Sequence, residues 1–170
     1  MLKLTSGLLA LLLASSAATA QQSFTADQLV AKNLEARGGA AALAAIKSLQ
    51  VEGRLITPGD FELKFKEVRL RQAAGDAVRD DLSVQGLTIV QAYDGANGWK
   101  INPFQGRRDA EKMSGDEARA MADQALISGT LLSAAANKRR VTSEGFEDFD
   151  GTNTSQLQVV RPDGDEFDYL

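Results

Sequence analysis

Four acidic residues near the carboxyl end of the chain are the side chains best suited to chemistry. Glu144, Glu147, Asp148 and Asp150 lie close together in the sequence. Paired carboxylates hydrolyse glycosidic bonds when one acts as an acid and the other as a base or nucleophile. Nothing in the sequence gives any two of these carboxylates different environments, and acidic residues beside turns are ordinarily solvated. We therefore expect that the protein is not an enzyme, with a carboxylate-based hydrolase as an alternative.

The composition excludes several other kinds of site. Histidine and cysteine are absent, which excludes Cys–His and Ser-His-Asp catalysis and also thiolate or imidazole metal sites. The segment 148–153 places acidic residues around a glycine, but it lacks the ligand spacing and terminal glutamate of an EF-hand calcium loop. We interpret this segment as a hairpin turn, and we expect no metal and no cofactor.

The charge of the chain argues against a nucleic-acid partner. The sequence contains 19 Lys and Arg and 23 Asp and Glu. Lys3 lies in the expected signal peptide that is described below. Without it, 18 basic residues remain against the same 23 acidic ones, for a net charge of −5. A mildly acidic chain has no electrostatic footprint for DNA or RNA.

The first twenty residues have the pattern of a secretory signal peptide. Lys3 forms a positive n-region, residues 8–13 form an apolar core, and residues 18–20 (Ala-Thr-Ala) form the motif that a signal peptidase cleaves. The apolar core is too short to span a bilayer. Residue 21 is Gln rather than the Cys that a lipid anchor requires. We expect a periplasmic protein, cleaved after Ala20, whose residues 21–170 form a single domain.

Two capping boxes predict helices that flank a run of strands. Thr25 with Gln28, and Ser114 with Glu117, have the spacing in which each side chain satisfies a backbone donor of the other residue. An alanine-rich stretch after the first helix loses little entropy in a further helical turn. The expected helices cover residues 24–36, 40–46 and 114–126.

Alternating apolar and polar residues predict antiparallel strands between and after these helices. Leu63 and Phe65 place apolar residues at odd positions, whereas Val68 and Leu70 place them at even positions. We expect a β-bulge near residues 66–67 to reconcile the two patterns. Sequential hairpins with segregated helices indicate an α+β fold. The expected strands cover residues 49–55, 61–70, 78–84, 87–93, 98–101, 140–146, 154–160 and 165–170.

The economical arrangement of these elements is a strongly curved antiparallel sheet with helices on its concave face. The last expected strand begins at Asp165 and reaches Leu170 without a terminating signal. A sheet that stops within a strand leaves an unpaired edge. We therefore expect the domain to be incomplete at its carboxyl end.

The most specific segment runs from Tyr93 to Phe104. Its Asp-Gly and Asn-Gly pairs favour a hairpin, which the only tryptophan follows. The segment resembles the D-G-x-x-L-W-x-Y-N-P-F signature of the LolA-type periplasmic lipoprotein carriers and their outer-membrane lipoprotein-sorting relatives. The stretch 68–71 is similar to the strand of those proteins that carries an Arg-Pro step, although the proline is absent. The residues that carry the resemblance are Asp94, Gly95, Trp99, Asn102, Pro103 and Phe104.

The resemblance implies an unclosed half-barrel that binds lipoprotein acyl chains or lipid for transfer to the outer membrane. It implies membrane-protein partners at the inner and outer membranes and a contact between Arg71 and the covering helices. We expect a monomer. A non-transport envelope sensor or protein-interaction module with the same fold is the alternative. Because interior and exterior residues alternate along barrel strands, the expected ligand-binding residues are Phe65, Leu87, Ile89, Trp99, Ile101 and Phe104.

Overall fold

The computed structural model describes residues 24–58 and 61–170, so the expected signal peptide lies outside the described residues. The described part is an α+β fold, as expected, with three α-helices and two antiparallel sheets. In chain order the elements are α1 (Ala26–Ala36), α2 (Gly39–Ala45), β1 (Ser48–Thr57), β2 (Phe61–Leu70), β3 (Ala77–Val84), β4 (Leu87–Tyr93), β5 (Gly98–Ile101), η1 (a 3₁₀ turn, Pro103–Gln105), β6 (Glu111–Lys112), α3 (Gly115–Ala125), β7 (Arg140–Phe149), β8 (Thr152–Val160) and β9 (Glu166–Tyr169).

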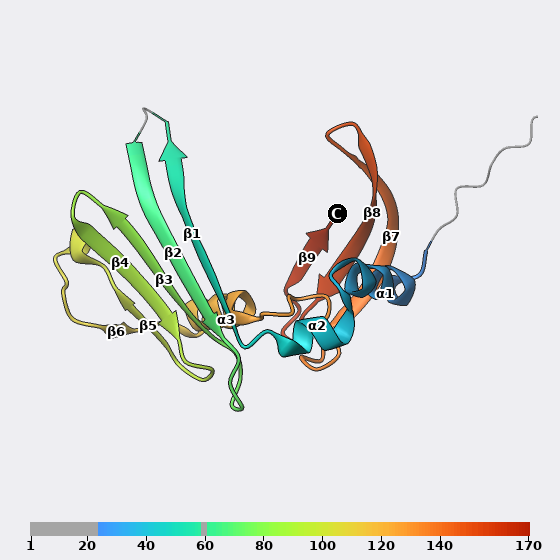
Figure 1. Cartoon of the computed structure of the whole chain (residues 1–170), viewed down its shortest axis with the longest axis horizontal. Helices are drawn as coiled ribbons and strands as arrows, with labels where there is room; N and C mark the ends of the chain where they lie inside the picture. Colours follow the sequence, from blue (N-terminus) through green and yellow to red (C-terminus); the bar gives the residue numbers. More distant parts are fainter. Residues whose placement is uncertain (1–23, 59–60) are drawn as a thin grey trace, which may run out of the picture.

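The strands form two sheets rather than the single curved sheet expected from the sequence. β1 to β6 pair in chain order to make the larger sheet, and β7 to β9 make the smaller one. No ladder connects the two sheets within the described residues. The segment that contains α3 separates β6 from β7, and a long connection of this kind does not impose the pairing that a short hairpin loop does. The two sheets stand on either side of α3 (Figure 1).

Both capping boxes are confirmed. The Thr25 hydroxyl accepts from the backbone N–H of Gln28, whose side chain accepts from the backbone N–H of Thr25. Ser114 and Glu117 make the same reciprocal pair at the start of α3. Lys100 donates to Glu117 at 2.6 Å, and this hydrogen bond together with those from Ser114 lowers the pKa of Glu117 to about 2. Among the described helices, none is long and apolar enough to cross a membrane.

The prediction of a β-bulge near residues 66–67 is wrong. β1 and β2 pair without interruption from Ser48 opposite Leu70 to Thr57 opposite Phe61. Val68 and Leu70 instead lie on the opposite face of the sheet from Leu63 and Phe65. Both faces of β2 therefore carry apolar side chains. The register irregularity of the described strands lies in β7, between residues 143 and 145. β6 and η1 were not predicted, whereas the other strands match their expected positions closely.

α3 packs against one face of the larger sheet, which we call the inner face. Val78 is buried there against Met113, Met121 and Ala125, with Tyr93 packed beside them. Residues directly opposite in an antiparallel pair share a face. The register therefore assigns the odd-numbered residues of β1, β2 and β4 and the even-numbered residues of β3 to the inner face, and the remaining residues of these strands to the outer face.

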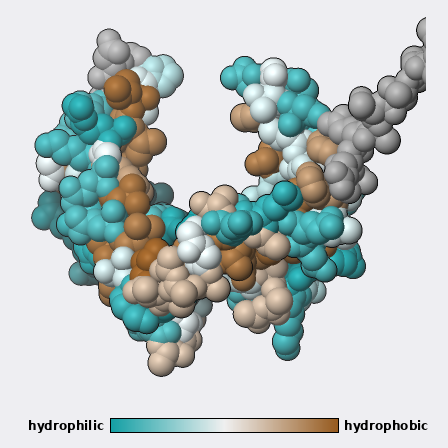
Figure 2. Space-filling view, turned by 45° about the vertical axis from the view of Figure 1, so that its right-hand side comes forward, coloured by the Kyte–Doolittle hydropathy of each residue, from teal (hydrophilic) through white to brown (hydrophobic). Residues whose placement is uncertain are grey.

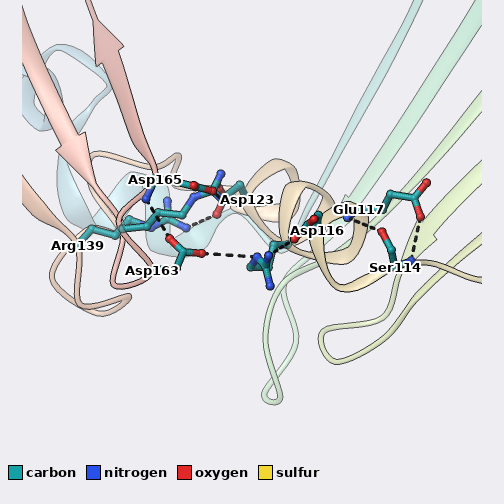
Figure 3. A network of polar contacts seen from close by, with 9 residues as sticks. Ser114, Asp116, Glu117, Asp123, Arg139, Asp163 and Asp165 are labelled. Carbon is teal, nitrogen blue, oxygen red and sulfur yellow. Dashed lines mark hydrogen bonds and ion pairs between the residues drawn. The ribbon is translucent and has the colours of Figure 1, made fainter.

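Ion pairs connect α3 to the loops that flank the strands of the smaller sheet (Figure 3). Asp123 of α3 pairs with Arg139 and, at 2.9 Å, with Arg161. One turn earlier, Arg119 lies 3.5 Å from Asp163. α3 is thus packed on the larger sheet and ion-paired to the loops of the smaller one.

Candidate functional site

The inner face of the larger sheet carries apolar side chains that extend beyond α3. One row of direct neighbours across four strands consists of Gly53, Phe65, Leu82 and Ile89. α3 packs on β3, β4 and β5, and in the described structure no helix packs closely on β1 or β2. The side chains that we name the apolar wall are Val51, Leu55, Leu63, Phe65, Leu82, Leu87 and Ile89.

The apolar wall is accessible. Leu55 is 50% exposed and Leu87 is 40% exposed. Figure 2 shows hydrophobic residues along the side of the larger sheet that borders the gap between the sheets. A contiguous exposed apolar surface in a folded protein marks a site of interaction or ligand binding.

On β2 and β3, the next row of the inner face toward α3 is polar. Glu67 and Asp80 lie directly opposite each other on β2 and β3 and are 4% and 9% exposed. Gln124 of α3 donates to Oε2 of Glu67 at 2.6 Å and to Oδ2 of Asp80 at 2.7 Å. Arg69 Nε donates to Oε1 of Glu67 at 2.7 Å. These four side chains form a polar floor at the end of the apolar wall.

The pKa values of the two carboxyl groups in the polar floor are shifted in opposite directions. Burial would raise the pKa of Glu67, but the hydrogen bonds from Arg69 and Gln124 outweigh burial, so the pKa is lowered. Burial raises the pKa of Asp80, and the negative charge of Glu67 adds to the rise. Oδ1 of Asp80 is buried and has no hydrogen-bond partner among the residues that the structure describes. The floor therefore favours an ionised Glu67 beside an Asp80 that holds its proton to higher pH.

We predict that Asp80→Asn stabilises the protein at neutral pH. An acid with a raised folded pKa destabilises the native state as pH rises from its unfolded pKa through its folded pKa, because the native state binds more protons in that window. Asparagine keeps an acceptor for Gln124 and removes the charge. We expect a melting temperature a few degrees higher at pH 7, which corresponds to about 1 kcal/mol, and no difference at the acidic end of the window. Thermal unfolding of both proteins across pH measures this.

Glu67→Gln is the matched control for Asp80→Asn. It removes the acceptor charge that Arg69 and Gln124 bind, so its sign is opposite and the variant is less stable at pH 7. Stability lost with Glu67 is present above its unfolded pKa and fades as pH falls through its lowered folded pKa. Equal destabilisation by both variants at every pH would contradict the raised pKa of Asp80 and the lowered pKa of Glu67.

The expected ligand-binding residues do not lie on one surface. Phe65, Leu87 and Ile89 belong to the apolar wall. Trp99 pairs with Ala92 and Ile101 pairs with Val90, which places both on the outer face. The hairpin loop causes this difference, because it pairs Tyr93 with Gly98 and so sets the parity of β5. The expectation that Leu87 and Ile89 share a surface with Trp99 is therefore wrong.

Phe104 belongs to neither strand surface. It lies in η1, where its backbone N–H donates to the Asn102 side chain at 3.1 Å, and it is 50% exposed. Trp99 itself is 44% exposed and borders an apolar depression of about 370 Å³ on the outer face. Val68 and Leu70 of β2 line the same depression. Tryptophan fluorescence will therefore report on the outer face rather than on the apolar wall.

Arg71 contacts the end of α2 and the turns after α3. Its Nε donates to the carbonyl of Ile46 at 3.1 Å, and its Nη2 donates to the carbonyl of Leu43 at 3.4 Å and to the Ser128 hydroxyl at 3.1 Å. Leu43 belongs to α2, and Ser128 lies in the turns after α3. One guanidinium therefore joins the carboxyl end of β2 to α2 and to the segment 126–139.

Two other groups of charged residues are further candidates for a functional site. A depression of about 800 Å³ lies on the outer face, but its charges pair with one another, as Lys66 does with Glu52 on the neighbouring strand and Arg79 with Asp81 on the same strand. The acidic residues 144, 147, 148 and 150 are exposed on β7 and its turn. Within the described residues, no three acidic side chains are arranged to hold a metal ion.

No protein-family model, curated protein or solved structure matches this chain. The features of the molecule that bear on its function are the apolar wall, the polar floor and the contacts of Arg71.

Proposed function

We propose that this protein binds an apolar ligand, lipoprotein acyl chains or lipid, on the apolar wall and carries it to the outer membrane. The observation that supports this most directly is the row Gly53–Phe65–Leu82–Ile89, which is apolar across four strands and lies beyond the helix that covers the rest of the inner face. Each methylene group transferred from water to such a surface contributes about 0.8 kcal/mol. An acyl chain laid along the wall would supply the missing packing partner.

In this proposal the two sheets are the walls of an unclosed half-barrel, and α1 and α2 form its lid. Arg71 holds the lid through the carbonyls of Leu43 and Ile46. Loading and release require the open and closed positions of the lid to have different affinities for the ligand. Membrane proteins at the inner and outer membranes would be the partners that shift this equilibrium.

We predict that Ile89→Asn weakens ligand binding and that Val90→Asn does not. The two residues are neighbours in β4, but Ile89 lies on the apolar wall and Val90 pairs with Ile101 on the outer face. Loss of one buried aliphatic side chain removes about 2 kcal/mol of transfer free energy, so the affinity should fall at least about tenfold. Titration with the apolar dye 1-N-phenylnaphthylamine measures the dissociation constant for both variants.

The same comparison can reject the proposal. Equal affinities of Ile89→Asn, Val90→Asn and the unmodified protein, with melting temperatures that show all three to be folded, would mean that the dye does not bind the apolar wall. Native mass spectrometry of protein purified from the periplasm identifies any bound lipid. Protein that is recovered free of lipid and also fails to bind the dye would contradict an apolar-ligand carrier.

Export is part of the same proposal. Residues 18–20 predict cleavage after Ala20 and a mature amino terminus at Gln21. N-terminal sequencing of protein from the periplasmic fraction should begin at Gln21. Replacement of Ala18 and Ala20 with larger residues should leave the precursor uncleaved. Periplasmic protein that begins at Met1 would show that the segment is not a cleaved signal.

A further inference from the structure

A small apolar pocket lies between the helical pair α1–α2 and the segment 126–139, and it is separate from the apolar wall. Its volume is about 270 Å³. This is slightly below the range of about 300–1,000 Å³ that is typical of sites for drug-sized ligands, so it suits a short alkyl segment. The apolar wall and this pocket share no residue. The pocket is lined by Val30, Leu34, Ala40, Leu43, Ala44, Arg71, Ser128 and Leu132.

Two guanidinium groups meet at Ser128: Arg71 lines the pocket, and Arg37 lies beside it. Arg71 donates to the Ser128 hydroxyl at 3.1 Å, and Arg37 Nη1 donates to the Ser128 carbonyl at 2.5 Å. Neither arginine forms an ion pair with any acidic residue in the described part of the chain. The two carboxylates nearest in sequence to Arg71 have other partners: Glu67 accepts from Arg69 and Gln124, and Asp76 accepts from the backbone N–H of Ile127.

The known hydrogen bonds do not use all the donors of these two cations. Arg71 contacts two carbonyls at the end of α2, which is how a cation commonly satisfies the last carbonyls of a helix. Each guanidinium has five N–H donors, and Nη1 of Arg71 and Nη2 of Arg37 donate to no residue that the structure describes. Guanidinium groups bind carboxylates and phosphates through paired, charge-assisted hydrogen bonds.

From this juxtaposition we propose that the pocket binds an anionic amphiphile. Its carboxylate or phosphate group is held by Arg37, Arg71 and the Ser128 hydroxyl, and the first part of its alkyl chain contacts Leu34, Leu43 and Leu132. Such a ligand neutralises two cations that have no carboxylate beside them. It also bridges α1, α2 and the segment 126–139, so its binding is coupled to the position of the helical pair.

Octanoate, 1-octanol and inorganic phosphate test the proposal, with binding measured by calorimetry. Octanoate should bind, octanol at least about tenfold more weakly, and phosphate more weakly than octanoate because it lacks the chain. Arg37→Gln and Arg71→Gln should each weaken octanoate binding several-fold without changing the affinity for octanol. Arg108→Gln, which removes an exposed arginine outside this pocket, is the matched control and should change neither affinity.

The titrations can reject the proposed binding of an anionic amphiphile in two ways. Equal binding of octanoate and octanol, unaffected by Arg37→Gln, would overturn the anionic site. Phosphate binding as tight as octanoate binding, unaffected by Leu34→Asn, would show an anion site without an alkyl subsite and would also overturn the proposal. Arg37→Gln preserves every contact of Arg71, so it keeps the test valid if Arg71→Gln unfolds the helical pair. Repeating the titrations in Ile89→Asn separates this pocket from the apolar wall, because the octanoate site should persist when the wall no longer binds dye.

Discussion

Asp123→Asn should lower the free energy of unfolding by about 3 kcal/mol. Asp123 is the carboxylate partner of both Arg139 and Arg161, whose side chains are 7% and 15% exposed. Within residues 24–58 and 61–170, Nη1 of Arg139 and Nε of Arg161 are already buried and have no hydrogen-bond partner. Without Asp123, Arg139 loses its carboxylate partner in the described structure, and Arg161 keeps only Asp165, whose side chain is 63% exposed. Breaking a buried ion pair by removing one partner typically costs about 3–5 kcal/mol. Urea denaturation measures the change.

Asp116→Asn is the matched control for this prediction. Asp116 lies on the same helix and also pairs with an arginine, Arg119, but its side chain is 88% exposed. Exposed ion pairs contribute about 0–1 kcal/mol, so this variant should unfold close to the unmodified protein. Similar losses for both variants would mean that general charge on α3, rather than the buried pairing of Asp123, determines stability.

Gly98→Ala should destabilise the protein by about 1–3 kcal/mol, the typical cost of inserting a methyl group into a filled core. A Cβ at position 98 would lie 2.6 Å from Sδ of Met113, 3.1 Å from Cβ of Met113 and 3.2 Å from Cβ of Ala118. Met113 is itself buried against α3. The added methyl group must therefore displace α3 from the sheet or distort β5. Thermal unfolding followed by circular dichroism gives the change in melting temperature.

Gly53→Ala offers a control on the same face of the same sheet. A Cβ at position 53 meets no atom within 4 Å, and its backbone does not have a positive φ. Alanine there reduces the entropy of the unfolded chain without creating a clash, so the variant should be as stable as the unmodified protein or slightly more stable. If Gly98→Ala were equally harmless, α3 would not be packed against β5 as described.

Local signals in the sequence predicted the helices and hairpins well. Thr25 with Gln28 and Ser114 with Glu117 are short-range pairs, so their spacing alone determines where α1 and α3 begin. The face of Trp99 could also have been predicted from local spacing. The Asp94–Asn97 loop pairs Tyr93 with Gly98, and counting outward from that pair places Trp99 beside Ala92.

The remaining features depend on residues that are far apart in the sequence. Gln124 meets Glu67 and Asp80 across 57 and 44 positions, and nothing local to any of the three indicates the contact. The same holds for Arg37 and Arg71 at Ser128. The bulge expected in β2 failed for a related reason, because apolar residues on both faces of a strand imitate a change of register when only one face is assumed to be covered.

The lack of strand pairing between the two sheets affects the cooperativity of unfolding. Residues in one continuous sheet tend to lose their amide protection together, whereas units joined by few contacts open separately. In the described structure the larger sheet is packed against α3, and ion pairs connect α3 to the residue before β7 and to the turn between β8 and β9. The amides of β7 to β9 can therefore exchange through a sub-global opening that leaves the larger sheet protected. Weakening Asp123 would lower the free energy of that opening first, so a single melting temperature would describe two cooperative units rather than one.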